Sequence, residues 1–298
     1  MPTATLTAGP IDYEDSGPPP GVPDAPTVVL LHGLLMDGTL WRKVVPGLRD
    51  VARCVVPTLP LGAHRTAMDP DADLEVRGMV GLVAELLEAL DLRDVVLVGC
   101  DWGGAQLLVT FGLDERVGSL VLCPSEAFDN YPPGLPGKNA ALAARIPGGI
   151  LAALTAMRWH PIRRSPLGLG WLSKRPVPRE VTDAWLRPAR VDRAVRRDLI
   201  KYGRTPYGKL PLERWAAEQA RFAGPVLVVW ATEDRMMPRD HGRRLAELFP
   251  RGRLVEVDDS YTLVPEDQPE RLTEELRRFL AEDLEGSTAE AGRATMRP

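Results

Sequence analysis

Short, continuous apolar runs recur along the chain, separated by polar or helix-forming segments. They lie at residues 27–31, 53–57, 95–98, 119–123, 225–230 and 254–257. Parallel strands covered on both faces show such runs, whereas half-exposed strands alternate apolar and polar residues. We therefore predict a mostly parallel sheet, with an additional strand or hairpin over residues 5–13.

Between these runs, apolar residues recur at helical spacing. In residues 74–92, Met79, Val83 and Leu86 fall on one face of a helix, whereas Glu85 falls off it. Further helices are predicted around residues 39–48, 102–113, 239–248 and 268–284. Strands that alternate with helices through short connections form right-handed βαβ units, so the fold class is α/β.

Residues 127–223 break this alternation. They contain no buried-strand pattern and consist of proline-punctuated helical stretches, which carry Trp159, Trp171, Trp185 and Trp215. We predict a core made of residues 1–126 and 224–285, with residues 127–223 inserted as a helical unit. The tail, residues 286–298, is small and polar and is predicted to be disordered.

The composition is that of an ordinary soluble protein. The chain has 298 residues, of which 44% are hydrophobic and 26% charged, and its formal net charge is −4. Nothing in this balance favours nucleic acid as a partner. The sequence contains no apolar run long enough to span a membrane and no recognisable export signal, so we expect a cytoplasmic protein without a membrane partner.

The three cysteines, Cys54, Cys100 and Cys123, lie at or within strand-like runs. An odd number of cysteines without an export signal argues against a disulfide framework, so we predict buried free thiols. We expect no cofactor and no metal. Nothing in the sequence specifies the oligomeric state.

The stretch from Val95 to Gly104 is the most informative part of the chain. It reads as a strand that turns sharply into a helix, with Gly99 and Gly103 two residues before and after Asp101. A side chain raised on such a turn needs small neighbours at these two positions, because the backbone there is strained. Cys100 lacks such neighbours, so Asp101 is the candidate nucleophile.

The sequence Gly-Cys-Asp-Trp-Gly-Gly at residues 99–104 resembles the G-H-D-W-G-G elbow of haloalkane dehalogenases and epoxide hydrolases. This resemblance implies an α/β-hydrolase fold in which residues 127–223 form a cap over the active site. It also implies that Asp101 attacks a halide- or epoxide-bearing carbon of a small, largely apolar substrate and forms an alkyl ester.

The loop that begins at His32-Gly33-Leu34-Leu35 resembles the oxyanion loop of this fold. The helix after Asp101 directs its positive end at any negative charge that develops beside the nucleophile. The N–H groups of Leu34 and Trp102 are therefore candidates for the oxyanion or halide hole. In dehalogenases the indole of the residue matching Trp102 also holds the halide. Leu34 and Leu35 replace the asparagine and the proline that dehalogenases and epoxide hydrolases carry there.

Two acidic residues are candidates for the acid of a catalytic triad. Asp234 lies four residues before Pro238 and follows a buried strand, which resembles the W-G-x-x-D-x-x-x-P loop of the family. Glu126 follows the strand at residues 119–123, where some dehalogenases place the acid instead. It is retained as the alternative.

The segment 258–269 resembles the G-H-F-x-x-x-E-x-P segment that carries the family's catalytic histidine, but it contains no histidine. Tyr261 is assigned to that position. A phenol with a pKa of about 10 is a poor base at neutral pH. Of the other histidines, His32 belongs to the oxyanion loop, whereas His64, His160 and His241 stay open as replacements for the missing base.

Three functional hypotheses follow. The first is a hydrolase that acts through an Asp101 ester, with its water activated by an unrecognised group. The second is a non-hydrolytic lyase, isomerase or cyclase in which Asp101 is a base and Tyr261 an acid. The third is a catalytically silent, ligand-binding member of the fold. The first is favoured because the nucleophile and acid positions are both occupied.

Overall fold

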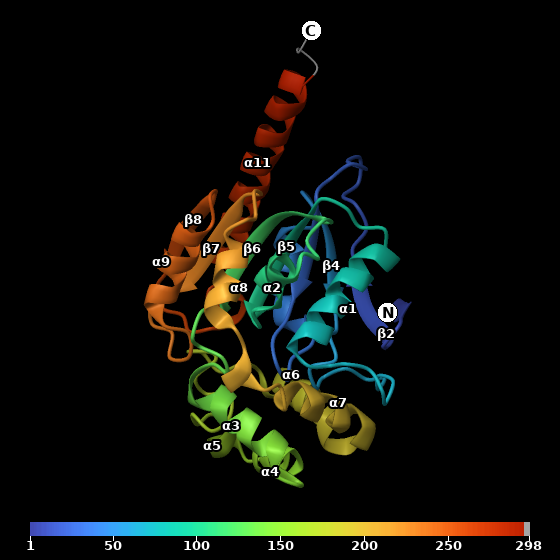
Figure 1. Ribbon diagram of the computed structural model, residues 1–298, viewed down its shortest axis with the longest axis vertical. Coiled ribbons are helices and arrows are strands. Elements are labelled where there is room, and N and C mark those ends of the chain that lie inside the picture. Colours follow the sequence, from blue (N-terminus) through green and yellow to red (C-terminus); the bar gives the residue numbers. More distant parts are fainter. Residues whose placement is uncertain (295–298) are drawn as a thin grey trace.

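The computed structural model describes residues 1–294 and contains one sheet of eight strands in the order β1-β2-β4-β3-β5-β6-β7-β8 (Figure 1). From β4 to β8 every neighbouring pair is parallel, which confirms the predicted sheet. The central strands are β4 (Arg53–Pro57), β3 (Thr27–Leu31), β5 (Val95–Asp101), β6 (Val117–Ser125) and β7 (Val226–Ala231), and β8 (Gly252–Val257) forms the far edge.

The predicted opening hairpin is present at the other edge. Strand β1 (Thr3–Leu6) pairs antiparallel with β2 (Gly9–Asp15), and β2 pairs antiparallel with β4. In the middle of the sheet, Val28 lies opposite Val96, and Val98 lies opposite Val121. These side chains are almost completely buried, as continuous apolar strands between two helical layers require.

Helices α1 (Val76–Ala89), α2 (Gly104–Phe111) and α8 (Leu212–Gln219) lie side by side across one face of the sheet (Figure 1). Helix α9 (Arg239–Leu248) packs on β7 and β8. Short α10 (Val264–Asp267) leads into α11 (Pro269–Ala294), where Arg277 Nη1 donates to the Gly47 carbonyl oxygen at 2.8 Å. No helix among residues 1–294 is both long and apolar enough to cross a membrane.

Between β6 and β7, within residues 127–223, the described chain contains helices joined by turns and no strand. They are α3 (Gly134–Arg145), α4 (Gly149–Ala156), α5 (His160–Arg163), α6 (Arg179–Val191), α7 (Arg193–Gly203), the 3-10 helix η3 (Tyr207–Lys209) and α8. Helices α3 to α7 gather at one end of the sheet (Figure 1). Helix α8 instead packs on α2, and the Trp215 and Phe111 rings meet edge to face at 5.3 Å. The inserted layer therefore ends before α8, earlier than residue 223.

Two predicted segments differ from the structure. The helix expected at residues 39–48 is instead two 3-10 turns, η1 (Gly38–Trp41) and η2 (Val45–Gly47). Pro46 has no N–H to continue an α-helix, and Gly47 disfavours one. The predicted disordered tail is helical to Ala294, and residues 295–298 lie outside the described residues.

The three cysteines are buried and free, as predicted. Burial raises the pKa of the Cys54 thiol to about 11 and that of the Cys100 thiol well above its ordinary value. Cys100 Sγ lies 3.5 Å from the Thr262 carbonyl oxygen. These thiols are therefore protonated packing groups, and Cys100 is unsuited to act as a nucleophile.

Candidate active site

The carboxyl ends of four parallel strands meet at one edge of the sheet. Gly33 follows β3, Asp101 ends β5, Glu126 follows β6 and Asp234 follows β7. Open α/β sheets bind their ligands at this edge, because neighbouring loops diverge there. The topology thus brings together residues that are far apart in the sequence.

Asp101 occupies a strained backbone position, with a φ of 67°. A non-glycine residue in this region costs about 1–3 kcal/mol and is found chiefly at functional sites. The carboxyl group is almost completely buried, and Oδ2 accepts a hydrogen bond from the Leu34 N–H at 3.1 Å. A Cβ on Gly33 would overlap this carboxyl group, so the glycine makes room for the Asp101 side chain.

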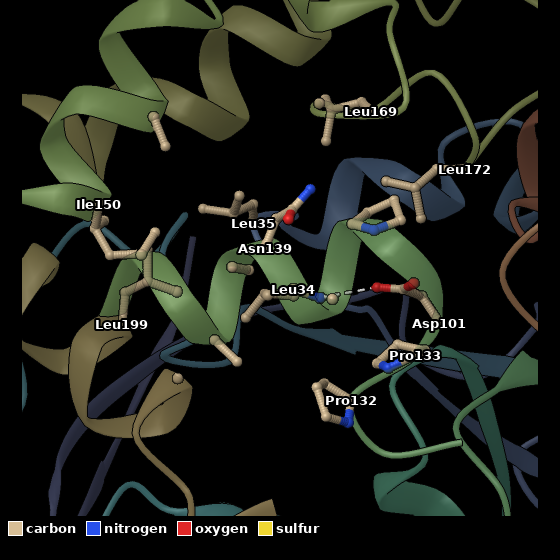
Figure 2. A pocket seen from close by; sticks show the side chains of 18 of the residues that line it. Leu34, Leu35, Asp101, Pro132, Pro133, Asn139, Ile150, Leu169, Leu172 and Leu199 are labelled. Atoms are coloured by element: carbon tan, nitrogen blue, oxygen red, sulfur yellow. Dashed lines mark hydrogen bonds between the residues drawn. The ribbon is translucent and has the colours of Figure 1, made fainter. Parts of the chain in front are cut away.

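A cavity of about 130 Å³ opens in front of Asp101. Figure 2 shows Asp101 at one end of it, with Ile150 and Leu199 toward the other. The lining comes from both the core loops and the inserted helices α3, α4 and α7. It is mostly aliphatic and includes Leu34, Leu35, Pro132, Pro133, Leu154, Met157, Leu169, Leu172 and Met236. Apolar cavities of roughly 150 Å³ hold a molecule the size of benzene, so the space suits a small apolar ligand.

Glu126 is a second buried carboxyl group in the lining of this cavity. Its Oε2 accepts a hydrogen bond from the Gly103 N–H at 2.6 Å. Its main-chain oxygen accepts hydrogen bonds from Gln106 Nε2 at 2.8 Å and from the Tyr131 hydroxyl at 3.0 Å. A Cβ on Gly103 would lie 2.6 Å from both this oxygen and the Tyr131 hydroxyl, so glycine is required for the close approach.

Asp234 lies in the loop after β7, as predicted. Its Oδ1 accepts hydrogen bonds from the N–H groups of Met236 and Met237 at 2.7 and 2.9 Å, and from the Thr262 hydroxyl at 3.0 Å. Its Oδ2 is buried and has no hydrogen-bond partner among the residues that the structure describes. A buried carboxyl oxygen normally has a donor, so Asp234 presents an unused acceptor.

Thr262, rather than Tyr261, is the residue that the structure brings to Asp234. The Tyr261 ring instead packs beneath the Arg235 guanidinium group, whose carbon lies 4.7 Å from the ring centroid, and Tyr261 does not line the cavity. The sequence carried the signal for Thr262. In the G-H-F-x-x-x-E-x-P segment the histidine precedes the proline by seven residues, and counting back from Pro269 reaches Thr262.

The four histidines of the chain are engaged away from this pair of carboxyl groups. His32 Nε2 accepts the Leu59 N–H at 2.8 Å, and burial lowers the pKa of His32 to about 4. His64 Nε2 contacts Asp198 at 3.2 Å, and His241 Nε2 contacts Asp129 at 3.4 Å, whereas His160 is exposed at the start of α5. Among the described residues, no imidazole contacts Asp101 or Asp234.

The donors predicted for the oxyanion or halide hole already have partners. The Leu34 N–H donates to Asp101, and the Trp102 N–H donates to the Cys100 carbonyl oxygen at 2.8 Å. The Trp102 side chain is buried and is not part of the cavity lining. The Leu34 N–H thus contacts the Asp101 carboxyl group directly, and the halide role of Trp102 stays a prediction.

Three further polar side chains line the cavity and were not predicted. They are Asn139 of α3, Tyr202 of α7 and Tyr207 of η3. Asn139 Nδ2 is buried without a hydrogen-bond partner, so it is an unused donor. Burial raises the pKa of both tyrosines above the ordinary value, so their hydroxyls stay protonated. The described residues contain no cluster of histidine, cysteine and acidic side chains placed to bind a metal.

Burial dominates the electrostatics of the three carboxyl groups. It raises the pKa of Asp101 to about 7, partly offset by the Leu34 N–H and increased by the Asp234 charge. It raises the pKa of Glu126 to about 8, with Asp101 adding to the effect, and that of Asp234 to about 6. Near pH 7 the site therefore holds both ionised and protonated carboxyl groups.

These raised pKa values predict how stability depends on pH. At these three carboxyl groups the folded state retains protons that the unfolded chain has lost, so their contribution to the free energy of unfolding should fall as pH rises from about 4 to about 8. Each carboxyl group contributes a slope of up to about 1.4 kcal/mol per pH unit. The double variant Asp101→Asn/Glu126→Gln should have a shallower slope than the wild type in urea denaturation across this range. Equal slopes would show that these groups are not protonated in the fold.

Fold and site together define the class of protein. Residues 26–269 match the alpha/beta hydrolase fold family, and the chain belongs to it. It is 25% identical to haloalkane dehalogenase 2 of Mycobacterium tuberculosis over 276 residues, which is 89% of each chain. It is 28% identical to a cis-3-alkyl-4-alkyloxetan-2-one decarboxylase of Xanthomonas campestris, over 91% of this chain and 92% of the relative.

Solved structures agree on the fold. A loop variant of the haloalkane dehalogenase DbeA from Bradyrhizobium elkanii superposes with a TM-score of 0.76 at 19% identity. The alignment covers 96% of this chain and 98% of that one. The protein is thus an α/β-hydrolase-fold protein resembling haloalkane dehalogenases.

Proposed function

We propose that this protein is an enzyme that attacks a small, largely apolar halide or epoxide with Asp101 and forms an alkyl ester. One observation carries the proposal. The strained, buried Asp101 faces an aliphatic cavity, and its carboxyl group is oriented by the Leu34 N–H. A carboxylate that has lost its water shell is a stronger nucleophile than one in solution.

With a halide, a carboxylate oxygen of Asp101 forms a bond to the carbon as the carbon–halogen bond breaks and the halide leaves. With an epoxide, the same attack breaks a ring carbon–oxygen bond, and the oxygen takes a proton from a neutral donor. The protonated Tyr207 hydroxyl can give this proton, whereas the amide of Asn139, an unused donor in the lining, can only donate a hydrogen bond to the departing atom. We assign them to the departing atom, and we assign the inserted helices to the role of a cap that keeps water from the nucleophile.

A non-hydrolytic reaction on the same fold is the second candidate. Hydrolysis of the ester needs a base, and no imidazole among the described residues contacts Asp101 or Asp234. One relative that matches most of this chain is named a decarboxylase, which is a lyase and not a hydrolase. In this alternative, the substrate breaks down to product without a water molecule. The earlier assignment of Tyr261 as its acid is weakened, because this side chain does not line the cavity.

The proposal is tested with a panel of butyl bromide, butyl chloride and butene oxide, measuring intact mass together with release of halide or diol. We expect an Asp101-dependent alkyl mass increase, with or without turnover. The rate of ester formation should increase as pH rises through about 7, because only the ionised Asp101 attacks. Absence of both adduct and product across the panel would reject the halide and epoxide assignment.

A further inference from the structure

Ester breakdown is the step for which the site lacks an obvious base. Glu126 is buried with a relative exposure of 7% and lines the same cavity as Asp101, whose exposure is 6%. Glu126 contacts no histidine among the described residues. His241 is instead paired with Asp129. Glu126 therefore has no imidazole to orient.

We propose that Glu126 itself is the general base and acid of ester breakdown at Asp101. This inference rests on the proposed function, since it requires an ester on Asp101. Glu126 would act directly on the attacking water, and it would not act as the acid of a triad.

The geometry fixes Glu126 beside the nucleophile. Its Oε2 is held by the N–H of Gly103, which is two residues after Asp101 at the start of α2. Its main-chain carbonyl oxygen accepts hydrogen bonds from both Gln106 Nε2 and the Tyr131 hydroxyl. The carboxyl group also interacts with the N–H of Glu126 itself, and it borders the cavity, where a ligand or a water molecule can reach it.

The charges around Glu126 make its pKa depend on whether Asp101 is ionised or esterified. It faces the carboxyl group of Asp101 and the phenols of Tyr131, Tyr202 and Tyr207, and no arginine, lysine or histidine of the described part of the chain lines the cavity. Burial is the main cause of its raised pKa, and the Asp101 charge adds to it. Ester formation removes that charge, so the pKa of Glu126 should fall when a base is needed.

Breakdown of the Asp101 ester consumes one water molecule. The Glu126 carboxylate takes a proton from water, and the hydroxide oxygen bonds to Cγ of the Asp101 ester. The bond between Cγ and the alkyl oxygen then breaks, and protonated Glu126 returns its proton to the departing alkoxide. The products are the alcohol and the Asp101 carboxyl group, which carries one oxygen from water and loses its proton to solvent.

The test is the lifetime of the ester in single-turnover reactions with butyl bromide, quenched in acid and followed by intact mass. We expect Glu126→Gln to form the ester at a rate within a few-fold of wild type and to lengthen its lifetime by about 10²–10⁴-fold. Glu126→Asp, which keeps a carboxylate, should lie between the two. Glu115→Gln, an exposed substitution before the other end of β6, is the charge-matched control and should match wild type.

The pH profile separates a chemical role from a structural one. Breakdown in wild type should rise with pH and level off at a pH below about 8, whereas Glu126→Gln should lack this inflection. Ester formation in Glu126→Gln also shows that the variant is folded around Asp101. An ester in wild type with the same lifetime and inflection in Glu126→Gln would overturn this inference alone. Absence of an ester in all proteins would overturn the Asp101 reaction on which it rests.

Discussion

Replacement of Asp101 by asparagine is expected to lower the rate of alkyl transfer from butyl bromide by about 10⁴-fold or more. The amide has nearly the same shape and can still accept the Leu34 N–H, so the elbow is retained. It carries no negative charge and cannot displace a halide. The fold should not be weakened, since the substitution removes a buried charge whose pKa burial raises. The measurement is halide release, with adduct detection by intact mass.

Two further variants serve as controls for the loss of alkyl transfer in Asp101→Asn. Asp101→Ala removes the carboxyl group entirely and guards against slow conversion of the amide back to the acid. Asp234→Asn removes the neighbouring charge that raises the pKa of Asp101, and should leave alkyl transfer active while shifting its pH dependence to lower pH. Halide release by both Asp101 variants within tenfold of wild type would contradict a nucleophilic role.

In the Glu126→Gln background, which lacks the proposed base, Thr262→His should accelerate ester breakdown by about 10²–10⁴-fold. Thr262 Oγ1 donates to Asp234 Oδ1, and the adjacent Oδ2 has no donor, so an imidazole at this position can donate its N–H to Asp234. A histidine held in this way has its second nitrogen free to take a proton from water. The measurement is the lifetime of the trapped ester, with a thermal melt to check that the buried, larger side chain is accommodated.

Tyr261→His is the matched control for this gain. Tyr261 packs under Arg235 and does not contact Asp234, so a histidine there should leave the ester lifetime unchanged. Acceleration by Tyr261→His but not by Thr262→His would restore the original alignment of Tyr261 with the family histidine. Failure of both in the Glu126→Gln background, in folded variants, would mean that the lack of a base does not limit breakdown.

Most of the fold could be predicted from local patterns. The apolar runs at β3, β5, β6 and β7 are continuous because both faces of a parallel sheet are covered, and they mark the strands directly. Gly99 and Gly103, two residues before and after Asp101, indicated its strained backbone, because larger residues do not fit at these positions. The segment at η1 and η2 was predicted wrongly because Pro46 outweighs its apolar spacing.

Fewer of the residues at the candidate site could be predicted from the sequence. Asn139 lies in a helix whose pattern gives no sign of function, and only the packing of the inserted helices over the core brings it to the cavity that contains Asp101. The shift from Tyr261 to Thr262 is one residue, and it was missed because the segment contains no histidine, although the spacing to Pro269 indicates Thr262. Burial and the shared cavity, which raise the pKa of Glu126, arise from tertiary structure alone.

Peptide mapping of the acid-quenched butyl adduct tests the central claim most directly, because the buried Asp101 and Glu126 and the half-buried Asp234 lie in or near the site. We predict that the butyl group is on Asp101 in wild type and that it is lost in Asp101→Asn. Product formation without alkylation of Asp101, or alkylation of Glu126 or Asp234 in its place, would contradict the account.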